Sequence, residues 1–232
     1  MLGLAAVGAG LAAGTMAWGS YAPNSGIFGR VIGRGPREPV AYLTFDDGPN
    51  PGATDRVLEI LDLEKVPATF FMVGRHVERH RRTALSVAQA GHDIGNHTYS
   101  HIKLHRTGPR RTMSEIRRGH EAIENVTGYT PRTFRAPHGY RSPFVSRAIT
   151  PYRYRTVGWT FGVWDSARPG AERIRSRVRA GLRPGAIVLL HDGDGYKEYG
   201  DRRQTVEALS GIIADTRAAG YRLESLARLV AD

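Results

Sequence analysis

The sequence predicts an α/β fold built on a mainly parallel sheet or barrel. From residue 40 onward, short apolar runs typical of buried strands alternate with amphipathic helical segments, which is the pattern of βαβ units. The chain has 232 residues, 41% of them hydrophobic, enough to bury the core of one α/β domain. Several of the apolar runs end in Asp, His or Arg, as expected where parallel strands reach the edge at which such folds bind ligands.

The expected elements follow one another in a regular alternation. Each expected strand is a short run rich in apolar or β-branched residues, bounded by turn residues. Strands are expected at residues 40–43, 68–73, 92–97, 133–135, 154–160, 186–190 and 220–223. Helices are expected at residues 53–63, 77–90, 113–126, 143–149, 172–180 and 205–219. Among their boundaries, Gly91 is expected to end the second helix as a left-handed cap and Gly128 to end the third, with Thr112 or Ser114 as the cap that begins the third.

The N-terminal segment differs in composition from the rest of the chain. Residues 1–29 carry no charged side chain, and residues 2–18 are apolar but consist mainly of Ala and Gly. This weakly hydrophobic stretch predicts a signal peptide or membrane anchor over residues 1–20, with membrane association through it. A linker rich in Gly, Pro and Arg is expected over residues 21–37, followed by a catalytic domain over residues 38–232.

The charges around this segment bear on where the protein works. No Lys or Arg precedes the apolar stretch, whereas Arg30, Arg34 and Arg37 follow it, so the positive-inside rule does not support an exported C-terminus. A start codon chosen too late would explain the missing basic residues. We expect an extracytoplasmic protein, secreted or membrane-anchored, with a cytoplasmic location as the alternative.

The chain is strongly basic and contains no cysteine. A formal charge of +11 favours contact with polyanions such as wall polymers, anionic lipids or nucleic acid, although solvated helix faces explain much of the scattered Arg equally well. No ordered basic-aromatic motif accompanies the charge, so specific nucleic-acid binding is not expected. The absence of Cys excludes a disulfide framework and a thiolate metal site. We expect a monomer.

Two adjacent carboxylates follow the first expected strand. Asp46 and Asp47 lie between that strand and a run of Gly and Pro that cannot continue it. A turn stabilised by an Asp side chain would explain one carboxylate by itself. Because the chain bends into its loop here, the two side chains can serve one site at the strand end.

Further polar residues occupy the ends of later strands. His97 and His101 are four residues apart, which on a helical turn brings both imidazoles within reach of one metal ion. Together with an Asp they form a two-His, one-carboxylate set, which leaves coordination positions open for water and substrate. Arg135 ends another expected strand, and His191 directly follows one more. Each of these side chains has a plain structural explanation by itself, but four such strand ends at one edge predict a catalytic site.

Five motifs in this order resemble those of the polysaccharide deacetylases of carbohydrate esterase family 4, the NodB homology domain. The resemblance extends from about residue 38 to the C-terminus. The motifs are residues 44–50, 97–101, 135–140, 159–165 and 187–192. The resemblance implies an irregular (β/α) barrel with about seven parallel strands. It also implies a metal-dependent hydrolase that removes N-acetyl groups from an amino-sugar polymer such as peptidoglycan, chitin or an exopolysaccharide.

The resemblance assigns roles to individual residues. Asp47, His97 and His101 would bind a divalent metal, with zinc preferred and cobalt, nickel or iron acceptable. Asp46 would act as general base and Arg135 would hold it ionised, while His191 would act as general acid supported by Asp165. The substrate side would comprise the backbone N–H of His138 as oxyanion donor, Leu189 beside the acetyl methyl group, and the aromatic residues Tyr140 and Trp159.

Two departures from the family pattern and two rival functions remain open at this point. The fourth motif often carries a further acidic residue where this chain has Gly162, and the third often carries an aromatic residue where this chain has His138. The same constellation could hydrolyse a small amide or a cyclic C–N bond. A non-catalytic basic glycan-binding module is the alternative outside the enzyme class.

Overall fold

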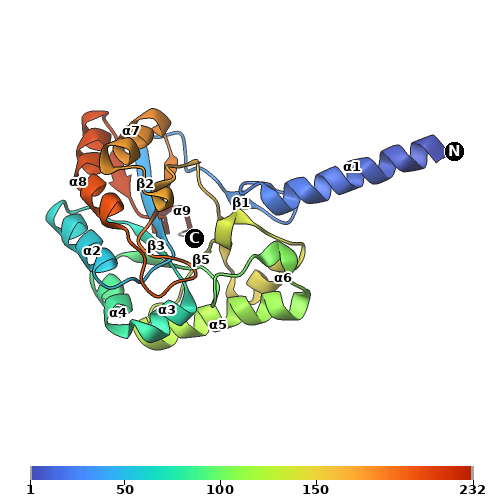
Figure 1. Cartoon of the computed structure of the whole chain (residues 1–232), viewed down its shortest axis with the longest axis horizontal. Coiled ribbons are helices and arrows are strands. Elements are labelled where there is room, and N and C mark those ends of the chain that lie inside the picture. The colour runs from blue at the N-terminus through green and yellow to red at the C-terminus, as the bar shows by residue number, and fades with distance from the viewer. Residues whose placement is uncertain (1, 231–232) are drawn as a thin grey trace.

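A curled parallel sheet with helices on its outside forms the body of the protein (Figure 1). The computed structural model describes residues 2–230. The strands lie in the order β1-β6-β5-β4-β3-β2-β8-β7, with β9 also pairing with β2, and every pairing is parallel. Their bounds are β1 Val31–Ile32, β2 Val40–Asp46, β3 Thr69–Met72, β4 Asp93–Asn96, β5 Thr133–Phe134, β6 Arg155–Val157, β7 Phe161–Gly162, β8 Ala186–His191 and β9 Arg222–Glu224. The predicted α/β barrel-like fold is therefore confirmed.

Strand β2 is the centre of this sheet. All seven of its residues are buried, as expected for a strand covered on both faces. It pairs along its length with β8, through registers from Ala41 opposite Ala186 to Asp46 opposite His191. On its other side it pairs with β3 near its carboxyl end and with β9 near its start. This register brings the end residues of β2 and β8, Asp46 and His191, to the same edge.

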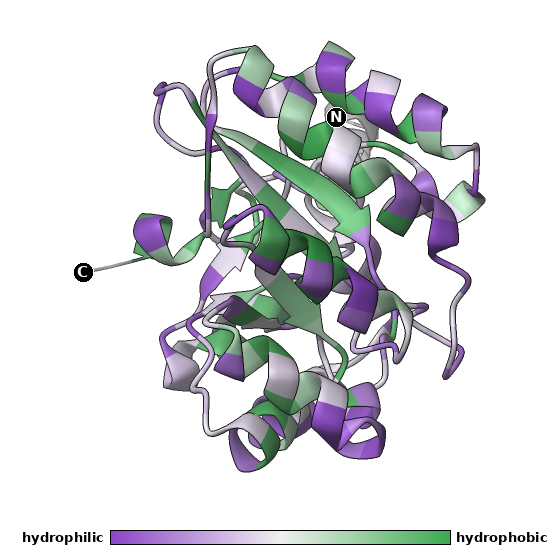
Figure 2. Ribbon diagram, turned by 90° about the vertical axis from the view of Figure 1, so that its left-hand side faces the viewer, coloured by the Kyte–Doolittle hydropathy of each residue, from purple (hydrophilic) through white to green (hydrophobic). Residues whose placement is uncertain are grey.

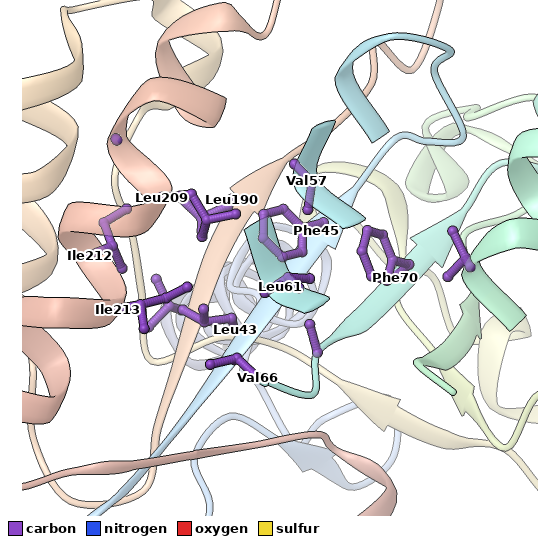
Figure 3. Close-up of a cluster of buried hydrophobic side chains, with 14 of the residues drawn as sticks. Leu43, Phe45, Val57, Leu61, Val66, Phe70, Leu190, Leu209, Ile212 and Ile213 are labelled. Carbon is purple, nitrogen blue, oxygen red and sulfur yellow. The ribbon is translucent and has the colours of Figure 1, made fainter. Parts of the chain in front are cut away.

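The helices cover the sheet through apolar faces (Figure 2). Their bounds are α1 Leu2–Tyr21, α2 Ala53–Leu63, α3 Gly74–Arg79, α4 Arg81–Gln89, α5 Pro109–Thr127, α6 Phe144–Ile149, α7 Ala171–Gly181, α8 Arg203–Ala218 and α9 Ala227–Val230. In the main core, Leu43, Phe45 and Leu190 of the strands pack with residues of α2 and α8, among them Leu61 and Leu209 (Figure 3). This core fixes the strands whose ends carry the polar residues.

Two helix boundaries differ from the prediction. The helix expected over residues 77–90 is two helices, because His80 leaves the helical region at φ −112° and ψ 50°. Helix α5 begins at Pro109 rather than at Thr112 or Ser114, since Pro suits the first turn of a helix, where its missing N–H is not needed. The predicted left-handed conformation of Gly91 is confirmed, at φ 76°, and Gly128 ends α5 as predicted, at φ 70°.

The N-terminal segment has two parts. Helix α1 extends away from the body (Figure 1), and among residues 2–230 no helix is long and apolar enough to cross a membrane. The part assigned to a linker by its composition packs on the domain instead of spanning open solvent. Its strand β1 pairs with β6, Phe28 is buried, and Ser25 accepts a hydrogen bond from the buried Arg141 through its backbone oxygen.

The core shown in Figure 3 gives a direct stability test. We expect Leu209→Ala to lower the free energy of unfolding by about 2–5 kcal/mol, because Leu209 is fully buried and its removal leaves a cavity. Leu63→Ala is the matched control, since Leu63 is 79% exposed and its truncation should change stability by no more than about 0.5 kcal/mol. Urea unfolding of both variants makes the comparison, and equal effects would contradict the packing described here.

Candidate active site

A cleft of about 250 Å³ opens at the carboxyl ends of the central strands. Loops at this edge of a parallel sheet are free to carry function, because the strands below hold their ends in place. The lining comprises Asp46, Asp47, His97, His101, His138, Trp159, Ser166, Leu189, His191, Asp194, Gly195, Tyr196 and Arg202. Eight of the eleven residues predicted for the site are in this lining, so the structure brings together side chains from widely separated motifs.

Asp46, the last residue of β2, is held by a buried arginine. Arg135 Nη1 donates to Asp46 Oδ1 at 2.6 Å and to Thr44 Oγ1 at 2.8 Å, and Nη2 donates to the backbone oxygen of Gly158 at 2.8 Å. The guanidinium is fully buried and lies over the Phe71 ring, 4.0 Å from its centroid. Burial lowers the pKa of Arg135, and the Asp46 carboxylate opposes that shift. This charge-assisted bond fixes the Asp46 carboxylate in one orientation.

Asp47 turns toward a different set of partners because the chain bends directly after β2. Its φ of 77° ends the extended conformation, so two successive carboxylates face one cleft. Asp47 Oδ1 lies 2.9 Å from His101 Nε2 and 3.5 Å from His97 Nε2. Burial opposes ionisation of Asp47, but the two imidazoles hold the pKa of its carboxyl well below the usual range.

The two histidines are not on a helical turn, which corrects the geometry expected from their spacing. His97 follows strand β4, and the chain reaches His101 through a loop in which Thr98 and His101 have φ of 68° and 58°. His97 Nδ1 lies 2.7 Å from the backbone oxygen of Arg135. As donor in that bond, Nδ1 carries the ring proton and leaves the Nε2 lone pair directed at Asp47.

Asp47, His97 and His101 fit a divalent metal ion. Their ligand atoms all lie within 4.8 Å of one another, and all three residues are buried. Asp47 Oδ1 is buried without a hydrogen bond from any residue between 2 and 230, an arrangement that a bound cation would satisfy. Two imidazoles and one carboxylate suit zinc and neighbouring transition metals and leave positions open for water and substrate.

Removal of one imidazole tests this set. We expect His97→Ala to weaken zinc binding by more than roughly 100-fold, because a direct ligand is lost. Loss of a residue that only hydrogen-bonds to a ligand typically weakens metal binding by roughly 10–100-fold. His105→Ala is the control, since His105 lies outside the cleft lining and packs against Tyr21 and Tyr140. Calorimetric titration of chelator-treated protein with zinc measures both affinities. Equal affinities for the two variants would mean that the metal binds elsewhere.

His191, at the end of β8, is oriented by a buried carboxylate. Its Nδ1 lies 2.8 Å from Asp165 Oδ1, and its backbone N–H donates to Asp165 Oδ2 at 2.8 Å. Thr205 Oγ1 also donates to Asp165 Oδ2, at 3.0 Å. Burial alone would lower the pKa of His191, but the Asp165 carboxylate, assisted by Asp47 and Asp46, raises it to about 9. A protonated imidazole whose Nε2 is not engaged by Asp165 can donate a proton into the cleft.

The remaining predicted residues occupy distinct places. His138, at φ 58°, lines the cleft, as do Leu189 and Trp159. Burial, together with the nearby His101, lowers the pKa of His138 to about 4, so its ring is neutral at pH 7. Arg135 and Asp165 lie behind the lining residues that they orient. Tyr140 lies outside the lining, and its ring packs against Tyr21 and His105.

Sequence reasoning missed five residues of the lining. These are Ser166, Asp194, Gly195, Tyr196 and Arg202. Four of them, all except Ser166, belong to the loop that follows β8, whose Gly-rich sequence begins two residues after His191. The sequence did contain one signal for this loop. The aromatic residue Tyr196 lies among Gly and polar residues, shortly after the motif at residues 187–192.

Fold and site together define an α/β barrel protein with the side chains of a hydrolase at the carboxyl ends of its strands. The model of the polysaccharide deacetylase family matches residues 33–157, and the chain belongs to this family, carbohydrate esterase family 4. The chain is 38% identical over 195 residues to a chitooligosaccharide deacetylase of Bradyrhizobium sp. (strain ANU 289), which covers 81% of this chain and 89% of that protein. It is 36% identical over 195 residues to a peptidoglycan-N-acetylglucosamine deacetylase of Bacillus cereus, with coverage of 83% and 89%.

Solved structures extend the comparison. The crystal structure of the Bc1960 peptidoglycan N-acetylglucosamine deacetylase matches with a TM-score of 0.80 and 30% identity, covering 84% of this chain and 90% of that one. A family 4 pseudoenzyme from Bacillus anthracis matches with a TM-score of 0.79 and 28% identity, covering 86% and 68%. Because this fold occurs in active and inactive proteins, activity must be argued from the side chains in the cleft.

Proposed function

We propose that this protein is a metal-dependent hydrolase that removes N-acetyl groups from an amino-sugar polymer. Zinc is the preferred ion at Asp47, His97 and His101, and cobalt, nickel or iron would also suit this donor set. A divalent ion held there would supply Lewis acidity, which acidifies water and polarises an amide carbonyl. The chain's own residues then supply the proton transfers and the positioning.

The proposed reaction balances with one water molecule. Asp46, oriented by Arg135, accepts a proton from the water as the water oxygen bonds to the acetyl carbon. The backbone N–H of His138 donates to the carbonyl oxygen as negative charge develops on it. His191 then protonates the amide nitrogen as the C–N bond breaks, leaving acetate and a free amino sugar. Leu189 borders the acetyl methyl group, and Trp159 faces the sugar.

The observation that carries this proposal is a pair of charged contacts beside the metal-ligand set. Asp46 accepts a hydrogen bond from the buried Arg135, which orients its carboxylate as a base, whereas the buried Asp165 contacts His191 and raises the pKa of its imidazole, which favours the protonated acid. Amide hydrolysis requires both, because nitrogen is a poor leaving group without a proton. A non-catalytic glycan-binding module would not require these two charged pairs.

Acetate release from candidate polymers tests the proposal. Peptidoglycan and chitooligosaccharides are the first substrates because relatives are named for them, and acetylated xylan tests O-acetyl release. The full chain should be used, since removing residues 1–37 would delete strand β1. We expect release by the zinc-loaded protein, none after chelation, and recovery when zinc is restored.

Other outcomes would favour the rival functions. Zinc binding without acetate release from any polymer would favour a small amide or a cyclic C–N bond as the substrate. Tight binding of acetylated glycan without turnover would favour a binding module, as the existence of a family 4 pseudoenzyme illustrates.

We further propose that the protein works outside the cytoplasm and that residues 1–20 act as its export signal or anchor. Helix α1 carries no charged residue and extends from the body (Figure 1), and its last turn contains the exposed residues Trp18 and Tyr21. Trp and Tyr are favoured at the boundary between membrane and water. Fusion of residues 1–37 to a reporter active only after export tests the proposal, and a silent reporter in a bacterial host would favour the cytoplasmic alternative.

A further inference from the structure

The loop between β8 and α8, residues 192–202, carries Tyr196 into the lining of the cleft. Two buried or half-buried arginines fix its backbone. Arg75 Nη2 donates to the backbone oxygen of Gly195 at 2.7 Å, and Arg202 Nε donates to that of Gly193 at 2.6 Å. These two hydrogen bonds therefore hold the backbone of the loop in one position.

The loop touches the metal-ligand set directly. A Cβ atom on Gly195 would lie 2.2 Å from His101 Nδ1, so only Gly permits this close approach. Asp194 Oδ1 accepts hydrogen bonds from the backbone N–H groups of Tyr196 and Lys197, both at 3.0 Å, which sets the turn that presents the tyrosine. The position of Tyr196 is thus defined relative to His101.

Tyr196 makes a paired surface with His138. Its hydroxyl lies 2.7 Å from His138 Nε2, and the two rings are stacked with their planes 26° apart and centroids 5.9 Å apart. The Tyr196 ring also meets His101 edge to face, with centroids 5.0 Å apart. Even with these contacts the Tyr196 residue is 55% exposed. A large ring therefore borders the cleft with free apolar surface.

From this geometry we infer that Tyr196 and His138 form a sugar-binding platform, an aromatic surface on which a pyranose ring of the polymer stacks. The inference rests on the proposed function and names a subsite for it. A pyranose ring presents C–H groups on its faces and hydroxyls at its edge, which suits a ring with an apolar body and a polar tip. Most other groups in the cleft are charged or polar, with Trp159 and Leu189 as the exceptions, so the paired rings add substantially to its apolar surface.

The two rings come from different parts of the chain and form one surface. Tyr196 follows β8 and stacks on the imidazole of His138, which follows β5. The pair therefore offers a sugar ring more apolar area than either ring would alone.

Binding to insoluble polymer by chelator-treated protein tests the platform without turnover. We expect Tyr196→Ala to weaken binding to chitin or peptidoglycan roughly fivefold to tenfold, because one stacking surface is lost. Tyr196→Phe should keep most of the binding. Tyr199→Ala is the matched control: Tyr199 lies in the same loop, is 60% exposed, and packs against His80 instead of the cleft.

Kinetics and metal content separate substrate binding from support of the metal ligands. Tyr196→Ala should raise KM for polymer by a larger factor than it changes either kcat or KM for a small aryl acetate, with zinc still bound. Wild-type affinity in Tyr196→Ala, or equal losses in Tyr196→Ala and Tyr199→Ala, would overturn the platform. Loss of zinc from Tyr196→Ala would assign the ring to support of His101. If the wild-type protein binds polymer but releases no acetate, the proposed function fails while the binding test still decides the platform.

Discussion

Replacement of Asp46 by Asn is expected to lower kcat for acetate release by roughly 10²–10⁴-fold, the usual contribution of a positioned general base. The amide oxygen of Asn can still accept the hydrogen bond that Arg135 Nη1 now donates at 2.6 Å, so the local geometry is kept. The amide has no basic lone pair with which to accept a proton at neutral pH. The variant should therefore bind zinc and polymer as the wild type does and fail only in the chemical step.

The control for this variant is Asp62→Asn, which makes the same chemical change on an Asp side chain that is 79% exposed. It should leave kcat within experimental error of wild type. Kinetics at saturating polymer, with zinc content measured for each protein, make the comparison. A wild-type kcat for Asp46→Asn with zinc bound would show that another group takes the proton, and a loss of zinc would show that Asp46 is itself a ligand.

Most of the fold could be predicted because its signals are local and repeated. The strand and helix over residues 40–63 lie where the apolar runs and their periodicity place them. The elements that escaped prediction are short: β1 and β7 have two residues each, too few to show a period. They exist because neighbouring strands offer them hydrogen-bond partners, and a tertiary partner leaves no trace in the local sequence.

The candidate site likewise has features that the sequence could predict and features that it could not. Asp46, His97 and His191 could be found because chemistry restricts the residue types at strand ends, and an ordered set of motifs identifies them. The backbone conformation that brings their side chains together could not be predicted from the sequence. The loop between His97 and His101 depends on residues at positive φ and has no helical spacing. Tyr196 was missed because its role arises from stacking on His138, which lies 58 positions away in the chain.

The second large effect on kcat is expected when the proton donor to the leaving amine is removed. We expect His191→Ala to lower kcat for amide substrates by roughly 10²–10⁴-fold, because the amine departs without a proton. Hydrolysis of an aryl acetate should fall far less, since a phenolate leaves readily without protonation. This contrast separates proton donation from a structural role, which would reduce both reactions alike. Parallel assays of acetate release from chitooligosaccharide and of phenol release from the ester make the measurement.

The pH profile supplies an independent check of the same step. His191 must be protonated to act, so polymer deacetylation should fall as pH rises through the pKa of this imidazole, about 9 in the metal-free protein. A bound cation would offset the Asp46 and Asp47 charges that help to raise this pKa. The alkaline limb of the pH–rate profile should therefore lie at or below pH 9 and above the ordinary histidine pKa near 6.5. Asp165→Asn removes the main partner that raises the pKa and should move the limb to lower pH. An unmoved limb in that variant would mean that His191 is not the acid.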